Sequence, residues 1–189
     1  MNASHANGGR VQDAYSLRCT PQVHGAAREA LGFARRVFEI EAPVGIASDV
    51  VCLGIAQLAT ISERRCERLV NPAIASEIKT LAHPASADTI PTSGNRDDHV
   101  SMSMSAGLKA ARAADLARHA IACELLCACE AIDLLAPLRS SPPLMRAHDF
   151  IRARVPAIEH DRSFSPDLRV ISDMIVSGAL ERSCAVDVN

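Results

Sequence analysis

The chain has 189 residues and a net charge of −2, and its arginines are scattered rather than clustered with aromatic residues. This charge pattern excludes nucleic acid as the main partner. Hydrophobic residues make up 48% and charged residues 22%, which is typical of a globular protein. Aromatic residues are only 3% and alanine is abundant, so we expect an all-α bundle whose long helices pack through small side chains.

Residues 1–10 are polar and lack the apolar core of a signal peptide. Residues 1–20 as a whole are predicted to form an active-site loop and its lead-in. Seven cysteines at irregular spacings indicate free thiols in a reducing compartment, so we expect a cytoplasmic protein. Apolar residues at helical spacing then predict a helix over residues 21–40. Thr20 has the features of its N-cap and Pro21 those of its first position.

A second helix is predicted over residues 43–69. Its apolar stretch is interrupted by Asp49 and Gln57, which favours a buried helix of a bundle over a membrane span. We expect its polar end, from Ser62 onward, to face solvent. The region 21–78 is therefore interpreted as helical.

Residues 79–99 contain prolines, a glycine and many small polar residues, without helical or strand periodicity. Connections of this length are often functional, so this one is predicted to be an active-site loop. Residues 100–136 carry no proline, and they predict a core helix that approaches about 50 Å in length. Residues 137–189 are expected to form shorter C-terminal helices.

The long helix carries three soft metal ligands at every fourth position, namely His119, Cys123 and Cys127. This spacing is compatible with zinc, but the surroundings are Ala and Leu and no second ligand pair follows, which favours core packing and no metal. Glu124 in the same apolar stretch is interpreted as a paired buried charge or an interface contact rather than a catalyst.

A candidate substrate site lies in the run Gln-Asp-Ala-Tyr-Ser-Leu-Arg-Cys-Thr-Pro-Gln-Val at residues 12–23. Tyr15 and Arg18 are three apart, so both can face one cavity, with Gln12 one turn earlier. A guanidinium binds a carboxylate with two hydrogen bonds, an amide orients it, and a phenol can relay a proton. The alternative is that the Tyr-Arg pair only anchors a loop to a helix end.

This run, and a second one from Lys79 to Ser103 that includes Lys-Thr-Leu-Ala-His-Pro-Ala-Ser and Asp-His-Val-Ser-Met-Ser, resemble the histidine ammonia-lyase family. The resemblance implies that Tyr15 lies beside the electrophile, that Arg18 pairs with the substrate carboxylate, and that Asp97 replaces a glutamate that acts as acid or base. Asp97 is one methylene shorter than glutamate, and Arg96 beside it favours the ionised carboxylate. The alternative is that Asp97 and Asp98 cap the N-terminus of the long helix. A site role is favoured for Asp97, whereas for Asp98 a cap and a catalytic role are weighed equally.

The family eliminates ammonia from an aromatic amino acid with a methylidene-imidazolone ring built from an Ala-Ser-Gly triplet, and no such triplet occurs in these residues. The resemblance therefore implies one incomplete, internally shortened lyase domain over residues 1–189, without its own electrophilic cofactor. The expected reaction is L-histidine to urocanate, with tyrosine or phenylalanine as alternative substrates. We expect the chain alone to be inactive and to self-associate, as in the family's homotetramers, or to join a complementing lyase subunit, without nucleic acid or membrane partners. The alternative function is a catalytically silent helical assembly module or the product of a decaying gene.

Overall fold

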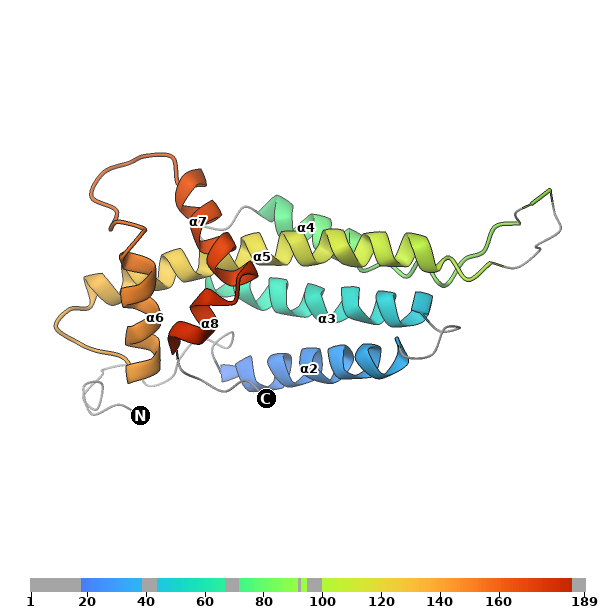
Figure 1. Ribbon diagram of the computed structural model, residues 1–189, viewed down its shortest axis with the longest axis horizontal. Coiled ribbons are helices and arrows are strands. Elements are labelled where there is room, and N and C mark those ends of the chain that lie inside the picture. The colour runs from blue at the N-terminus through green and yellow to red at the C-terminus, as the bar shows by residue number, and fades with distance from the viewer. Residues whose placement is uncertain (1–17, 39–43, 67–71, 92, 95–99, 185–189) are drawn as a thin grey trace. The chain divides into compact units, whose positions relative to one another are not determined.

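The computed structural model of the protein describes residues 18–38, 44–66, 72–91, 93–94 and 100–184 (Figure 1). Every regular element within these ranges is a helix, as the sequence predicts. The helices are α2 (Thr20–Val37), α3 (Val44–Arg65), α4 (Pro72–Leu81), α5 (Ser103–Leu134), α6 (Pro142–Arg152), α7 (Ser165–Val176) and α8 (Ala179–Cys184).

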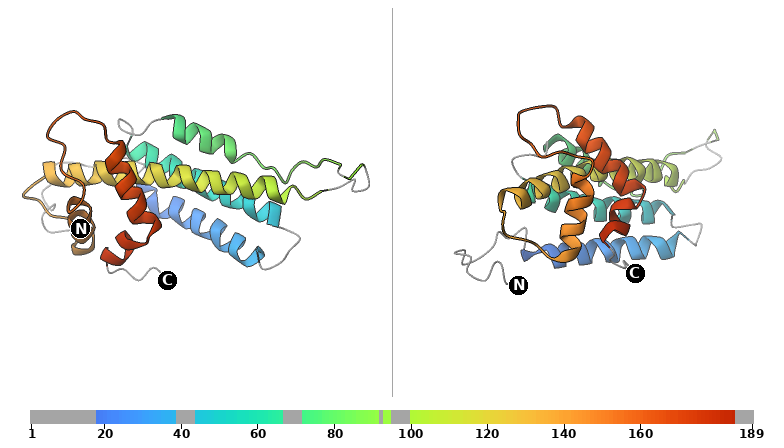
Figure 2. Two further views of the ribbon diagram at one scale, coloured as in Figure 1. Left: turned by 45° about the horizontal axis from the view of Figure 1, so that its top comes forward. Right: turned by 60° about the vertical axis from the view of Figure 1, so that its left-hand side comes forward.

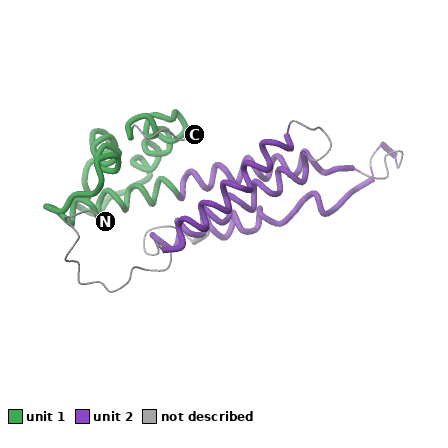
Figure 3. The backbone as a smooth tube through the Cα atoms, turned by 90° about the horizontal axis from the view of Figure 1, so that it is seen from below, with its two compact units in different colours: residues 1–13, 121–189 green, residues 14–120 purple. Residues whose placement is uncertain are grey.

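The chain divides into two compact units, coloured separately in Figure 3. One consists of residues 14–120, and the other of residues 1–13 and 121–189. The boundary falls within α5, directly after Ala120. Each unit has its own hydrophobic core, and the predicted single domain stays a prediction.

In the unit of residues 14–120, α3 packs against both α2 and α4. Figure 2 shows α2, α3 and the first part of α5 running lengthwise beside one another. Gly54 of α3 allows close approach to α2, because a Cβ there would lie 3.3 Å from the Ala30 side chain. Small residues therefore set the spacing of these helices, as the composition predicts. The core of this unit comprises Cys52, Ile55, Ala56, Ala59, Ile78, Ala113, Leu116 and Ala117.

Helix α3 is the one helix in the described part of the chain that is long and apolar enough to cross a membrane, judged by length and composition alone. In the structure 56% of its most apolar window is buried inside the protein. Asp49 is among its buried residues. This burial confirms the interpretation of α3 as a buried helix of a bundle.

The second unit is built from the end of α5 together with α6, α7 and α8. Helix α8 packs against both α6 and α7. The core of this unit comprises Ala122, Leu126, Cys129, Ile151, Val155, Ile171 and Met174. The side chains of Ile151, Val155 and Ile171 are almost completely inaccessible to solvent.

Three local predictions were wrong. Thr20 is the first residue of α2 rather than its cap; Cys19 occupies that position and makes no side-chain capping bond. Ser62 is buried, not solvent-facing, because α3 packs against α5 there and the Ser62 hydroxyl donates to the Ala120 carbonyl at 3.5 Å. The loop begins at Ala82 rather than residue 79, because a continuous helix runs from Pro72 to Leu81.

Candidate functional site

Only one of the four predicted site residues can be located. Arg18 is exposed and lies two residues before the start of α2. Gln12, Tyr15 and Asp97 lie outside the described residues, as does Asp98. Their grouping with Arg18 into one site stays a prediction.

The segment that contains Asp97 connects α4 to α5, and several described contacts hold it. Two of its amides bind one carboxylate of α3: the Ala85 N–H donates to Asp49 Oδ1 at 3.0 Å, and the Ser86 N–H donates to Asp49 Oδ2 at 2.7 Å. Each carboxylate oxygen therefore takes one neighbouring backbone amide. Asp49 itself is only 3% exposed.

Lys109 of α5 supplies the charge that accompanies this buried carboxylate. Its Nζ lies 3.5 Å from Asp49 Oδ1 and also donates to the carbonyl of His83. Burial alone would raise the pKa of Asp49, but the hydrogen bonds from Ser86 and Ala85 and the charge of Lys109 outweigh it and hold the pKa below its usual value. Asp49 is therefore an anion at neutral pH.

Further along the same segment, Thr89 binds Val100. The Thr89 hydroxyl accepts a hydrogen bond from the Val100 N–H at 2.8 Å and donates one to the Val100 carbonyl at 3.1 Å. These bonds join residues that are 11 apart in the sequence. Asp97 falls between the two in the sequence.

Sequence reasoning missed the roles of Asp49, Lys109 and Thr89. A signal for Asp49 existed, because a carboxylate in an apolar helix needs a partner. Lys109 gave no signal, since a lysine near the start of a long helix is ordinary, although its side chain is only 23% exposed. Thr89 gave no signal, since a threonine in a polar loop is ordinary.

The three cysteines of α5 differ in burial. Cys129 lies in the core, where burial raises its pKa to about 11, and burial also raises the pKa of Cys123. The Nδ1 atom of His119 lies 2.7 Å from the Asp115 carbonyl. No group of three or more His, Cys, Asp or Glu residues in the described ranges is placed to hold a metal ion. Cys123 and Cys127 are only half-buried and His119 is exposed, so the predicted core packing is wrong for His119.

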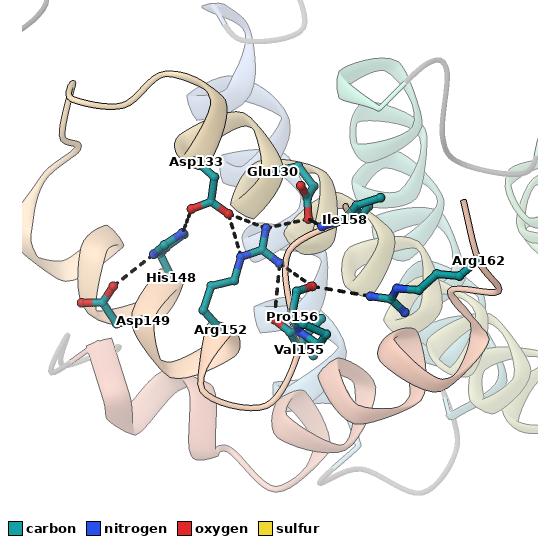
Figure 4. Close-up of polar contacts among 9 residues, drawn as sticks. All are labelled: Glu130, Asp133, His148, Asp149, Arg152, Val155, Pro156, Ile158 and Arg162. Atoms are coloured by element: carbon teal, nitrogen blue, oxygen red, sulfur yellow. Dashed lines mark hydrogen bonds and ion pairs between the residues drawn. The ribbon is translucent and has the colours of Figure 1, made fainter. Parts of the chain in front are cut away.

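A second polar cluster lies in the unit that contains α6 (Figure 4). Arg152 of α6 binds Glu130 and Asp133 of α5, and also the carbonyls of Val155 and Pro156. Glu130 in turn accepts the N–H of Ile158 at 3.1 Å. These bonds connect α5 and α6 with each other and with residues 155–158, which follow α6.

His148 extends this cluster at its edge. Its Nε2 lies 2.7 Å from Asp133 Oδ1, and its Nδ1 lies 3.1 Å from Asp149 Oδ1. Burial would raise the pKa of Asp133, but hydrogen bonds and charge from His148 and Arg152 outweigh it and lower that pKa. The sequence carried a readable signal here, since Glu130 and Asp133 are three apart and His148 and Arg152 four apart on their helices.

The chain is similar in sequence and in fold to known proteins. The family model for aromatic amino acid lyases matches residues 1–43 and 72–153. The chain belongs to the aromatic amino acid lyase family. Curated histidine ammonia-lyases from Myxococcus xanthus and from Anaeromyxobacter sp. are 37% and 40% identical to it, over 94% and 96% of this chain. Those matches cover 45% and 46% of the relatives, so the chain spans about half the length of the curated relatives it matches.

Solved structures agree on the fold. Histidine ammonia-lyase from Trypanosoma cruzi superposes with a TM-score of 0.85 at 32% identity, covering 91% of this chain and 44% of that one. A tyrosine aminomutase from Streptomyces globisporus shares the fold, with a TM-score of 0.82 at 24% identity over 95% of this chain and 45% of the other. The predicted all-α lyase-like bundle is therefore confirmed.

The predicted internal shortening is also confirmed. The Myxococcus alignment runs over 229 residues although it covers 94% of a 189-residue chain, so that lyase has residues inside the matched region that this chain lacks. Residues 44–71 of this chain, which include α3, lie outside the match to the family model.

Proposed function

We propose that this chain contributes substrate-binding and proton-transfer residues to an ammonia-lyase active site, and that the inherited reaction is L-histidine to urocanate. The observation that carries the proposal is 37% to 40% identity with histidine ammonia-lyases over nearly the whole chain. The Tyr15 and Arg18 run and the segment around Asp97 add to it, because both resemble active-site runs of the family.

In this proposal Arg18 binds the carboxylate of the substrate, and Gln12 orients it. A guanidinium presents paired N–H donors in the geometry of a carboxylate. Tyr15 and Asp97 handle protons at the reacting carbon and the leaving amine. The roles of these residues come from the family motif, and the exposed position of Arg18 is compatible with its role.

The electrophile must come from elsewhere. The family's methylidene-imidazolone is built from Ala-Ser-Gly, and the 189 residues contain no such triplet, so they do not fit this group. We therefore propose that these residues work only together with a lyase segment that carries the triplet, in a cytoplasmic assembly of several subunits. The alternative is a catalytically silent helical assembly module or a decaying gene product.

The test is reconstitution. The 189-residue chain is incubated with L-histidine alone, and then together with a polypeptide that carries the Ala-Ser-Gly half of a related lyase, while urocanate absorbance is followed. We expect no urocanate from the chain alone, since no residue supplies an electrophile, and urocanate from the pair. Parallel assays with tyrosine and phenylalanine decide the substrate. Urocanate formed by the chain alone would contradict the requirement for a partner.

Two variants locate the site within the reconstituted enzyme. Arg18→Ala leaves the substrate carboxylate unpaired and should cost about 2 to 4 kcal/mol of binding, seen as a higher KM. Tyr15→Phe keeps the ring and removes the hydroxyl, so it should lower kcat more than it changes KM. Asp97→Glu restores the acid of the family. Activity that is unaffected by both Arg18→Ala and Tyr15→Phe would favour the silent module.

A further inference from the structure

We propose that Asp49 and Thr89 are positioning residues that, together with Gly45, hold both ends of the segment that carries Asp97. The inference rests on the proposed function for its catalytic consequence, but not for its structural one. Gly45 and Asp49 lie outside both family-like runs quoted above, and Thr89 has no role assigned within the second run.

The first end is held by Asp49. A carboxylate that is 3% exposed is costly to bury, and apolar packing would attach a connection to α3 at lower cost. The Asp49 carboxylate also fixes an orientation. The consecutive amides of Ala85 and Ser86 donate to its two oxygens at 3.0 Å and 2.7 Å, so both the position and the orientation of the peptide between them are fixed. Lys109 binds both Asp49 and the His83 carbonyl, so the residues on either side of Pro84 are held too.

The second end meets the same face of α3. A Cβ at Gly45 would lie 2.7 Å from the Ser101 carbonyl and 3.3 Å from Ser103 Oγ, so only glycine allows this approach. Gly45 and Asp49 are four residues apart in α3, and they therefore lie one turn apart on one helix face. One short stretch of α3 thus supports the segment where it leaves α4 and where it enters α5.

Between these two anchored ends, Thr89 fixes its own distance from Val100. Its hydroxyl uses both its acceptor and its donor capacity on the backbone of Val100. Met102, two residues later, has a φ of 52°, a left-handed conformation that costs a residue with a side chain about 1 to 3 kcal/mol and persists only where its surroundings hold it. The backbone near α5 is therefore constrained.

The catalytic consequence follows from chain position. Asp97 lies between Thr89 and Val100 in the sequence, and the Thr89 bonds hold these two described residues together. Arg18 precedes α2 and does not belong to this segment. Loosening the segment should therefore weaken proton transfer more than substrate capture.

The experiment compares Thr89→Val, which keeps the shape and removes the hydroxyl, with Thr89→Ser, which keeps the hydroxyl. Thr80→Val is the matched control, because the Thr80 hydroxyl bonds only within its own helix, to the Ser76 carbonyl at 3.1 Å. The readout on the 189-residue chain is the rate of tryptic cleavage after Arg96. Circular dichroism checks that all variants keep their helices.

We expect Thr89→Val to speed cleavage after Arg96 about tenfold through local opening. Thr89→Ser and Thr80→Val should match the parent chain. Asp49→Asn, which weakens the other anchor, should also speed cleavage. Unchanged cleavage in Thr89→Val, or equal acceleration at all arginines, would overturn the proposal.

A second readout uses the reconstituted enzyme. Thr89→Val should lower kcat by about 10- to 100-fold with little change in KM, and Thr89→Ser should restore it. A raised KM at unchanged kcat would contradict the positioning role. If Thr89→Val speeds cleavage but no partner restores activity to the parent chain, the positioning stands structurally and the proposed function fails instead.

Discussion

The guanidinium of Arg152 lies 2.7 Å from the carboxylate of Glu130, and the same nitrogen lies 2.7 Å from Asp133 (Figure 4). The side chains of Arg152 and Glu130 are 13% and 19% exposed, so this pair is largely desolvated. Hydrogen bonds to Glu130 and Asp133 outweigh the effect of burial and raise the pKa of Arg152, which keeps it charged. One side chain thereby pairs with two carboxylates and binds two backbone carbonyls.

We predict that Arg152→Met lowers the free energy of unfolding by about 2 to 4 kcal/mol, because it leaves both carboxylates without their cation. The value lies below that for a fully buried pair because Asp133 is 34% exposed. Urea denaturation followed by circular dichroism measures it. Arg169→Met, at an exposed position of α7, is the control and should change the free energy by less than about 0.5 kcal/mol. Equal effects of the two variants would contradict the role of Arg152.

Two glycine substitutions are predicted to have opposite signs. Gly45→Ala should destabilise the fold by about 1 to 3 kcal/mol, since its Cβ would lie 2.7 Å from the Ser101 carbonyl. Gly25→Ala, in α2, has nothing within 4 Å of the new Cβ and should stabilise by about 0.5 to 1 kcal/mol through helix propensity. Thermal unfolding of both variants checks this. A stabilising Gly45→Ala would show that α3 does not approach Ser101 closely.

The fold was largely predictable because its signals are local. Proline and apolar spacing located α2, α3 and α5 to within a few residues, and the small-residue composition predicted their close packing. The burial of Ser62 was not predictable, because it depends on contact with Ala120, 58 residues away. The same holds for the candidate site: its local motifs were readable in the sequence, and its long-range contacts were not.

Short motifs indicated the candidate residues Tyr15, Arg18 and Asp97 through resemblance to a family. The residues that hold the Asp97 segment come from three separate elements: Asp49 from α3, Lys109 from α5 and Thr89 from the connection itself. No spacing in the sequence relates them. Only the folded chain brings Asp49 and Lys109 to the backbone at the start of the connection, and Thr89 to Val100.

The lowered pKa of Asp49 makes its anchor dependent on pH. A carboxyl whose pKa is lower in the folded than in the unfolded state stabilises the fold fully above the unfolded value, near 3.8, and loses this contribution as pH falls through the folded value. We predict that Asp49→Asn lowers the free energy of unfolding by about 1 to 3 kcal/mol at pH 7. The gap between parent and variant should shrink as the pH falls through 3.8 toward the folded value. Urea unfolding at pH 7, 5 and 3.5 measures it, and a gap independent of pH would contradict an anionic anchor.

Two exposed apolar side chains of α5 predict where the chain associates with a second copy. Met104 and Leu108 are 77% and 65% exposed, and they lie four residues apart on one helix face. Apolar side chains of this size grouped on a surface favour burial against another chain. We predict that the parent chain sediments as an oligomer at micromolar concentration. Leu108→Glu should shift it toward the monomer with unchanged helical content, while Ala111→Glu, an exposed small residue of the same helix, should not. A helical, folded monomer of the parent chain would contradict association, and dissociation by both variants alike would place the contact elsewhere than at Leu108.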